Sequence, residues 1–462
     1  MEVDATALTA LIANPLVASI GEDKPVPPTL TQSVPLIKAD QAWTAGYTGS
    51  GWTVAILDTG VDKTHSFIGA GKVVAEACFS TTSSSDHSTT VCPNGLSSQT
   101  GSGAGVNCVG QYGTAIYGCD HGTHVAGIAA GKDGIYSGNP INGVAKDANI
   151  IAIQIFSRFT GTDCTDSGYS SPCAYSWTSD QDLALEHVYA LRTTYNIAAV
   201  NMSIGGGRYY SNCDVDSGST KAAIDTLRAV GIATVISSGN GDPTTGIGYC
   251  DSICSPACIS TAVSVGATTK TDVEAGYNNF HPTMLSLFSP GSSITSSIPG
   301  GGWGIKSGTS MAAPHVTGAW AILKQKSPGA SVTEILNSFK TTGVLVTTGC
   351  GTGVQKPRID VLAALSLFPN PVPAITSLSP ASATAGGDAF TLTVNGSNFV
   401  GTSVVRWNGA DLTTSFVSVT QLTAAVTAAD IATGANVTVT VFNQTPDGGL
   451  SDPPLNFTVN NP

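Results

Sequence analysis

Charged residues are scarce in this sequence. Of its 462 residues, 19 are Lys or Arg and 31 are Asp or Glu, so the charged fraction is 11%, whereas an average soluble domain has roughly 25%. The net charge is −12 and Lys and Arg form no cluster. Because nucleic acid and anionic membranes both require concentrated positive charge, the composition excludes these two partners. The hydrophobic fraction of 41% also excludes a disordered chain, which combines low hydrophobicity with high charge.

Long hydrophobic runs are missing as well. No apolar run approaches the roughly 18–20 residues that a membrane-spanning helix needs, so we expect no transmembrane segment. The mostly apolar stretch 7–20 contains Pro15, and Glu2 and Asp4 stand where a secretory signal has basic residues. If the protein is exported, we expect its signal peptide to be absent from this sequence.

Cysteine is absent from both ends of the chain. All eleven cysteines lie between Cys78 and Cys350, in surroundings rich in Gly, Ser and Asp. Such a pattern is typical of a disulfide-linked domain in an oxidising compartment. A local pair such as Cys164–Cys173 is plausible, although connectivity does not follow from spacing. Because eleven is odd, one thiol is left over, and the isolated Cys350 is our prediction for it.

Zinc is the alternative interpretation of the cysteines, through Cys250, Cys254 and Cys258 at intervals of four residues. However, the sequence contains no CxxC pair and lacks the two-pair spacing of structural zinc sites. We therefore expect no metal ligands among the cysteines.

The chain divides into three regions and a linker. Residues 1–30 are too short to fold alone. Residues 31–366 alternate apolar β-branched runs with helical patterns, which predicts an α/β domain with a parallel sheet covered by helices on both faces. The expected strands are 53–57, 149–155, 198–204, 232–237 and 262–266, and two of the expected helices are 180–193 and 221–230.

A Pro-rich linker, 367–373, separates this domain from the C-terminal region. Residues 374–462 show short alternating strands separated by Gly, Asn and Pro turns, without a helical period. The expected strands include 390–394, 403–407, 436–442 and 455–459. This pattern predicts an all-β sandwich of immunoglobulin-like size.

A carboxylate ends the first predicted strand, in Val54-Ala-Ile-Leu-Asp58-Thr-Gly60. Functional groups gather beyond the carboxyl ends of parallel strands. Aspartic proteases also present Asp-Thr-Gly, but their chemistry needs two carboxylates that share a proton. The possible partners, Asp166 and Asp216, lie in polar loops with no strand before them, so this alternative is weak.

Two histidines follow in His121-Gly-Thr-His124. His121 precedes a helix expected to begin near Thr123, and this rim position suits a general base. His124 lies one turn on, so we expect it in the core. A metal site formed by this pair would need a third ligand, and the sequence has no HExxH pattern.

Ser310 and Asn240 each have two interpretations. Ser310 stands where a loop enters an apolar helix, so it is either an N-cap or a nucleophile near the free N–H groups of the helix start. Asn240 follows an apolar strand in Ser238-Gly-Asn240. It either tolerates a left-handed turn or donates its amide N–H to a reacting oxygen.

Five blocks of the sequence together resemble the signature blocks of subtilisin-like serine proteases (subtilases). They are Asp58-Thr-Gly, His121-Gly-Thr-His-Val-Ala-Gly, Asn201-Met-Ser-Ile-Gly-Gly, Ser238-Gly-Asn and Gly308-Thr-Ser-Met-Ala-Ala-Pro. They occur in that family's order, over about residues 31–366. The order Asp, His, Ser differs from that of α/β-hydrolases. The resemblance implies a subtilisin-like three-layer α/β fold and a serine endopeptidase.

The resemblance also implies a role for each site residue. Ser310 would be the nucleophile, His121 the general base and Asp58 its partner in a catalytic triad that forms an acyl-enzyme. The side chain of Asn240 would complete the oxyanion hole. Substrate would bind along two segments, formed by Ser203, Ile204 and Gly205 and by Ser237, Ser238 and Gly239.

No cofactor is expected for the chemistry. The resemblance allows structural calcium, but we assign no calcium ligand, because His65-Ser-Phe-Ile68 replaces a stretch that holds one in compact relatives. Asp242 and Asp251, near the expected S1 pocket, could favour basic side chains in the substrate.

Residues 1–30 resemble the end of an inhibitory subtilase propeptide, which we expect to be cut within 27–34. Residues 374–462 resemble an IPT/TIG immunoglobulin-like domain. We thus expect a secreted, monomeric endopeptidase that acts on proteins and peptides and is inhibited by its own propeptide. The alternative is a surface binding protein whose protease domain is catalytically degenerate and whose β-module carries the function.

Overall fold

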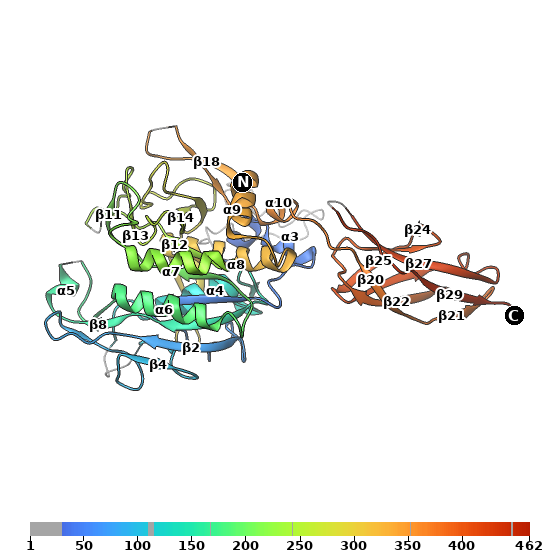
Figure 1. Ribbon diagram of the computed structural model, residues 1–462, viewed down its shortest axis with the longest axis horizontal. Helices are drawn as coiled ribbons and strands as arrows, with labels where there is room; N and C mark the ends of the chain where they lie inside the picture. The colour runs from blue at the N-terminus through green and yellow to red at the C-terminus, as the bar shows by residue number, and fades with distance from the viewer. Residues whose placement is uncertain (1–29, 110–114, 167, 243, 352, 445–446) are drawn as a thin grey trace, which may run out of the picture.

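The computed structural model describes residues 30–462 except 110–114, 167, 243, 352 and 445–446. The predicted propeptide remnant, 1–30, lies outside the described residues apart from its last one. The described chain forms a larger α/β lobe and a smaller all-β lobe, with the C-terminus at the far end of the smaller lobe (Figure 1). None of the described helices is long and apolar enough to cross a membrane.

A ten-stranded sheet forms the centre of the larger lobe. It is parallel from β19 to β2 and has an antiparallel strand at each edge. In spatial order its strands are β18 (Val344–Thr347), β19 (Gln355–Arg358), β15 (Leu287–Pro290), β14 (Val263–Thr268), β12 (Ala233–Ser237), β10 (Ile197–Met202), β1 (Thr53–Asp58), β7 (Asn149–Gln154), β2 (Val73–Phe79) and β4 (Ser98–Thr100). The expected parallel sheet is therefore present.

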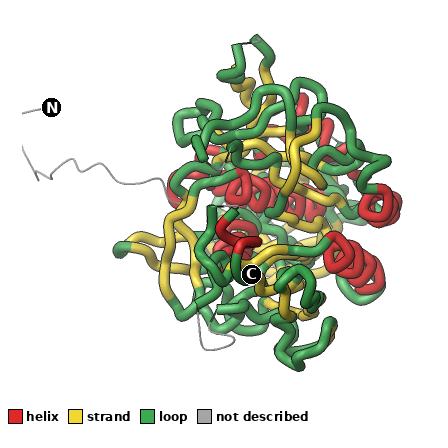
Figure 2. The backbone as a smooth tube through the Cα atoms, turned by 90° about the vertical axis from the view of Figure 1, so that its left-hand side faces the viewer, coloured by secondary structure: helices red, strands yellow, loops and turns green. Residues whose placement is uncertain are grey.

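Helices cover both faces of this sheet. On one face, α4 (His121–Ala130) and α8 (Thr309–Lys326) pack against the strands, and on the other face α6 (Thr178–Leu191) and α7 (Gly218–Ala229) lie side by side. The central strands are buried on both faces, which explains their continuous apolar sequences. In Figure 2, helices lie both in the middle of the lobe and at its right-hand edge, and long loops form much of the remaining outline.

The larger lobe has further helices and strands outside the ten-stranded sheet. Its other helices are α2 (Leu30–Leu36), α3 (Ala39–Thr44), α5 (Thr162–Thr165), α9 (Val332–Thr342) and α10 (Val361–Leu365). Its other strands are β3 (Ser88–Thr89), β5 (Gly134–Tyr136), β6 (Asn139–Ile141), β8 (Ser157–Phe159), β9 (Cys173–Tyr175), β11 (Gly206–Tyr209), β13 (Ile253–Ser255), β16 (Ile294–Ile298) and β17 (Gly302–Lys306).

The predicted central strands and helices agree with these elements within about three residues at each end. The largest difference concerns the helix predicted at 221–230, because α7 begins at Gly218. The strand predicted at 198–204 is also shorter than expected, because β10 ends at Met202. The chain leaves the sheet at Ser203, where it begins to form one side of the candidate site. The helix predicted near Thr123 begins two residues earlier, at His121.

The smaller lobe contains only strands among its described residues. One sheet has the order β20-β22-β26-β25 and the other β21-β29-β27-β23-β24, with β28 beside β27. The strands are β20 (Ala374–Ser379), β21 (Ser382–Thr384), β22 (Phe390–Ser397), β23 (Val404–Trp407), β24 (Ala410–Asp411), β25 (Thr414–Ser418), β26 (Gln421–Val426), β27 (Ala435–Asn443), β28 (Gly449–Leu450) and β29 (Leu455–Asn460). A separate apolar core fills the space between the sheets, as expected for a β-sandwich.

The β-module packs directly on the larger lobe at the end of α3. Gly401 N–H donates to Ala45 O at 3.0 Å, and Val400 belongs to the buried core of the larger lobe. A Cβ on Gly46 would lie 3.0 Å from the ring of Phe416. Lys326, the last residue of α8, donates to Asn370 in the linker. Since Ser310 stands near the other end of α8, about 24 Å along the helix axis separates it from Lys326.

Five disulfides connect ten of the eleven cysteines: Cys78–Cys92, Cys108–Cys119, Cys164–Cys173, Cys213–Cys258 and Cys250–Cys350. The pair Cys164–Cys173 is confirmed. Our prediction that Cys350 is the free thiol is wrong, because Cys350 meets Cys250 across 100 residues and the free cysteine is Cys254. With Cys250 and Cys258 in separate disulfides, the zinc interpretation is excluded.

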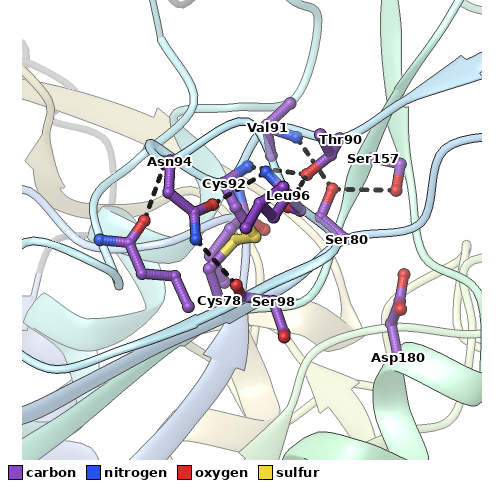
Figure 3. Close-up of a disulfide and its surroundings, with 12 residues drawn as sticks. Cys78, Ser80, Thr90, Val91, Cys92, Asn94, Leu96, Ser98, Ser157 and Asp180 are labelled. Atoms are coloured by element: carbon purple, nitrogen blue, oxygen red, sulfur yellow. Dashed lines mark hydrogen bonds between the residues drawn. A yellow bond between two sulfur atoms is a disulfide. The ribbon is translucent and has the colours of Figure 1, made fainter.

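The Cys78–Cys92 disulfide fixes the loop that follows β2 (Figure 3). Beside it, Val91 N–H donates to the hydroxyl of Ser80 at 2.9 Å, and Ser80 is 3.0 Å from the hydroxyl of Ser157. These side chains are buried, and the Asp180 carboxylate accepts two further hydrogen bonds from Thr81 in the same loop, each at 2.9 Å.

Removing the Cys250–Cys350 disulfide is expected to destabilise the larger lobe. A crosslink that closes a 100-residue loop restricts the unfolded chain strongly, so the double replacement Cys250→Ser with Cys350→Ser should lower the free energy of unfolding by about 2–5 kcal/mol. Urea unfolding without reductant measures this. The matched control is Cys254→Ser, which should remove the single titratable thiol of the denatured protein with little loss of stability. Two further thiols in denatured wild type would contradict the pairing.

Candidate active site

The candidate residues meet at the carboxyl edge of the main sheet. Asp58 is the last residue of β1, Ser237 is the last residue of β12, and Ser203 directly follows β10. His121 begins α4, and Ser310 is the second residue of α8. Five segments far apart in the sequence therefore converge where open parallel sheets place their functional groups.

His121 is bonded to Asp58 at the bottom of this site. The His121 Nδ1 atom lies 2.8 Å from Oδ1 and 3.0 Å from Oδ2 of Asp58, and Thr59 N–H donates to the same Oδ1 at 2.7 Å. An ionised carboxylate only accepts hydrogen bonds, so Nδ1 carries the proton and Nε2 is left as an acceptor. Asp58 is fully buried, whereas 22% of the His121 side chain is exposed.

Gly122 allows α4 to approach the end of β1. A Cβ at this position would lie 2.4 Å from Gly60 O and 3.1 Å from the Asp58 carboxylate. Its N–H donates to the hydroxyl of Thr59 at 2.9 Å. A larger residue would push the helix away and lengthen the Asp58–His121 hydrogen bond.

Ser310 faces the segment that follows β10. Its hydroxyl donates to Ser203 O at 3.3 Å, and the hydroxyl of Ser203 donates to Ser310 O at 2.8 Å. Ser310 lies in the first turn of α8, where backbone N–H groups have no partner within the helix. The helix dipole favours negative charge at the same place.

The side chain of Asn240 is oriented by Thr309. Its Oδ1 accepts from Thr309 N–H at 2.8 Å and from the Thr309 hydroxyl at 2.9 Å. This hydrogen-bond pattern fixes which end of the amide is oxygen and leaves Nδ2 as a donor. Asn240 is exposed although the residues before it are buried, so the donor is accessible from solvent.

The two predicted substrate-binding segments lie side by side. The hydroxyl of Ser237 donates to Ile204 O at 3.1 Å. Cys254 lies behind both segments: a Cβ on Gly239 would be 2.5 Å from Cys254 Sγ, and a Cβ on Gly205 would be 2.9 Å from Cys254 Cβ. Gly239 also has a φ of 109°, so both space and backbone conformation require glycine there.

Two neighbours of the site were not predicted from the sequence, Thr309 and Cys254. The odd number of cysteines predicted one free thiol but did not indicate which cysteine carries it. Burial raises the pKa of the Cys254 thiol. Ser238, also predicted to line the site, is fully buried, and its N–H donates to Val265 O at 2.9 Å.

His124 belongs to the core, as expected. Its Nε2 lies 3.1 Å from both Ile294 O and Gly304 O, so Nε2 carries the proton, and burial lowers the His124 pKa to about 3. Ser296 returns a hydrogen bond to His124 O at 2.8 Å. The β16–β17 hairpin thus holds α4 in place.

An ion pair connects the same hairpin to the start of α4. Lys306 Nζ lies 2.9 Å from Asp120 Oδ2, and the Asp120 carboxylate makes no capping bond to the helix. Asp120 precedes His121, and Lys306 ends β17 shortly before Ser310. The pair therefore joins the segments that carry the two candidate residues.

A third histidine, His315, is likewise not part of a metal site among the described residues. His315 is fully buried on α8 and bonded to Met311 O and to the hydroxyl of Ser33, each at 2.8 Å, and burial lowers its pKa to about 4. Within the described residues, no group of three or more His, Cys, Asp or Glu side chains is placed to hold a metal ion.

The two acidic residues near the expected S1 pocket are already paired within the chain. Asp251 accepts from Arg208 at 2.7 Å, and Asp242 accepts from the N–H groups of Thr244 and Thr245. A preference for basic side chains stays a prediction, and a basic substrate would have to compete with Arg208 for Asp251.

Comparison with protein-family models finds two matches. The model of the subtilase family matches residues 49–357, and the IPT/TIG domain model matches residues 373–459. Together they cover the larger lobe from β1 onward and the β-module.

Two subtilisins and one solved protease structure are also similar to this chain. Subtilisin DY from Bacillus licheniformis is 30% identical over 316 residues, which are 68% of this chain and 91% of that protein. Subtilisin NAT from Bacillus subtilis subsp. natto is 29% identical over 349 residues, 74% of each chain. A solved protease structure from Pseudoalteromonas arctica superposes with a TM-score of 0.54 at 25% identity, covering 73% of this chain and 94% of that one.

Proposed function

The chain belongs to the subtilase family of serine endopeptidases, and we propose that it hydrolyses peptide bonds in proteins through a triad of Asp58, His121 and Ser310. The observation that carries the proposal is the buried Asp58–His121 hydrogen bond of 2.8 Å, which directs the free Nε2 of the imidazole away from the carboxylate. Ser310, at the dipole-favoured start of α8, supplies the nucleophile.

The reaction proceeds through an acyl-enzyme. Ser310 Oγ attacks the scissile carbonyl while its proton passes to His121 Nε2, and Asp58 stabilises the resulting imidazolium. The imidazolium then protonates the leaving amine as the C–N bond breaks. A water molecule, deprotonated by the same nitrogen, hydrolyses the ester and regenerates Ser310.

The oxyanion that forms during each attack is bound by two donors, the Asn240 side chain and the Ser310 backbone N–H. Thr309 holds the Asn240 amide by its oxygen, so the donor needs no reorientation when charge develops.

Substrate binds along Ser203, Ile204 and Gly205 as an added strand, with Ser237, Ser238 and Gly239 as one wall of the S1 pocket. Ser310 Oγ donates to Ser203 O at 3.3 Å. A substrate N–H that takes this carbonyl as its acceptor releases the Ser310 hydroxyl, which can then turn to His121.

The protein is secreted, monomeric and made as a zymogen in this proposal. Five disulfides support an oxidising compartment. Val34 is buried in the core and Ser33 is bonded to His315, which favours a propeptide cut in the first half of 27–34. No cofactor takes part in the chemistry, and a structural calcium remains unassigned.

A fluorophosphonate probe tests the proposal, because it reacts with an activated serine by forming an Oγ–P bond and releasing fluoride. Wild type should be labelled and should digest casein, whereas Ser310→Ala should show neither property. A chelator should leave labelling unchanged. Folded wild type that is not labelled would instead support the degenerate surface binding protein.

A further inference from the structure

A buried asparagine, Asn279, packs against the glycine that precedes Asn240. Only 1% of Asn279 is exposed, and it lies in the loop that connects β14 to β15. A Cβ on Gly239 would be 2.4 Å from Asn279 Nδ2, so the amide of Asn279 touches the backbone of Gly239 directly. The proposed mechanism uses Asn240 but gives no task to Asn279.

Gly239 needs contacts from other segments because its own backbone is permissive. Its φ is 109°, and glycine has more conformational freedom than any other residue. A rotation about the Gly239 backbone would displace Asn240, whose Nδ2 is the proposed oxyanion donor. The position of this donor therefore depends on the groups that hold Gly239.

Both polar groups of the Gly239 backbone are bonded. Its N–H donates to the hydroxyl of Thr309 at 3.1 Å, and its carbonyl oxygen accepts from Asn279 N–H at 3.0 Å. The carbonyl belongs to the planar peptide group that Gly239 shares with Asn240. The hydrogen bond from Asn279 therefore fixes the plane of the peptide bond that leads into Asn240.

The side chain of Asn279 is itself held by two contacts with the segment 249–254. Its Oδ1 accepts from Tyr249 N–H at 3.0 Å, and its Nδ2 donates to Cys254 Sγ at 3.4 Å. The first contact determines which end of the amide is oxygen. Because Cys254 N–H donates in turn to Ser238 O at 2.9 Å, the same segment also holds the residue before Gly239.

We propose that Asn279 is a positioning residue for the oxyanion hole, because its side chain packs against Gly239 and so keeps the Asn240 amide where the oxyanion forms. This inference rests on the proposed function, since it concerns the donor of that mechanism. Thr309 orients the side chain of Asn240, whereas Asn279 fixes the backbone from which that side chain projects. A preorganised donor needs no reorganisation when charge develops, so Asn279 acts on the transition state and hence on kcat.

Asn279→Ala is expected to lower kcat about five- to tenfold with little change in KM. The variant removes both side-chain hydrogen bonds and leaves space beside Gly239, so the glycine is free to move and the donor is no longer fixed. Asn443→Ala is the matched control. Asn443 is fully buried in the β-module, where its amide donates to Pro371 O and Asn398 O at 2.8 Å each. This control should lose stability but keep the wild-type kcat.

A double-mutant cycle with Asn240→Leu separates positioning from general structural damage. If Asn279 acts through Asn240, Asn279→Ala should change kcat less than about twofold once residue 240 is leucine. Equal losses of kcat in both backgrounds, an unchanged kcat in folded Asn279→Ala, or a raised KM at constant kcat would overturn the inference. Should Asn279→Ala not fold, Asn279→Asp takes its place in the cycle with the same expectation. It keeps the size of the side chain and the acceptor for Tyr249 N–H but lacks the Nδ2 donor.

Nuclear magnetic resonance of Ser310→Ala protein tests the inference independently of the proposed function. With ¹⁵N-labelled asparagine, the side-chain amide signal of Asn240 is assigned by its absence from Asn240→Leu. Asn279→Ala should shift and broaden this signal, whereas Asn443→Ala should leave it unchanged, whether or not wild type is a protease. An Asn240 signal that Asn279→Ala leaves unchanged would overturn the inference. A changed signal together with an inactive wild type would support the positioning by Asn279 and refute only the proposed function.

Discussion

Replacing His121 by alanine is expected to lower kcat for peptide hydrolysis about 10⁶-fold, the magnitude measured in a subtilisin when its histidine or its serine is removed. Without the imidazole, no base accepts the proton of Ser310 in the proposed mechanism, since the Asp58 carboxylate is fully buried. The loss is measured with a chromogenic peptide substrate. Absorbance gives the concentration of each variant, and circular dichroism shows that the variant is folded.

The double variant is the informative control for this prediction. If the members of the proposed triad act as a unit, His121→Ala combined with Ser310→Ala should be nearly as active as either single variant, rather than about 10⁶-fold weaker again. His87→Ala, at an exposed histidine paired with Asp163, should retain wild-type kcat. A loss of only about tenfold in His121→Ala would show that another group accepts the proton.

The sequence predicts the central sheet well because burial on both faces leaves a strong pattern. The buried strands β1, β7, β10 and β12 are continuous apolar runs, and no solvent-exposed residue interrupts them. By contrast, the β16–β17 hairpin contains fully buried serines. Their burial depends on carbonyl acceptors in α4, such as His124 O, and no local pattern in the sequence reveals a partner 172 residues away.

The pairing of the cysteines likewise depends on partners that are distant in the sequence. The local pair Cys164–Cys173 could be anticipated because nine residues form a short loop. Cys350 was mistaken for the free thiol because its partner, Cys250, is distant in the sequence and near only after β18 and β19 have joined the sheet. A cysteine that is far from the other cysteines in the sequence can therefore still lie next to one of them in the structure.

The candidate site residues stay predictions, but the positions of three of them in the fold could be read from the sequence. Asp58, His121 and Ser310 each stand at the end or the start of an element, and the structure brings the elements of the first two within hydrogen-bond distance. The contribution of Thr309 was not predictable, because it depends on the direction in which the Asn240 amide points.

Replacing Asn240 by leucine, which has a similar size but no donor, is expected to lower kcat about 10²–10³-fold with little change in KM. The magnitude is again one measured in a subtilisin. The effect falls on kcat because the amide N–H meets a full negative charge only in the transition state, whereas the substrate carbonyl in the ground state gains little from it. Steady-state kinetics on the same chromogenic peptide separate the two constants.

Variants of Thr309 test whether the orientation of Asn240 matters as much as its presence. Thr309→Ser keeps the hydroxyl that donates to Asn240 Oδ1 at 2.9 Å and should keep kcat near wild type. Thr309→Val leaves only the backbone N–H contact to Asn240 at 2.8 Å and also removes the acceptor of Gly239 N–H at 3.1 Å. The amide is then held less firmly, and kcat should fall by at least about three- to tenfold, the effect of one hydrogen bond. If Asn240→Leu instead raised KM and left kcat unchanged, the side chain would bind the ground state and not the oxyanion.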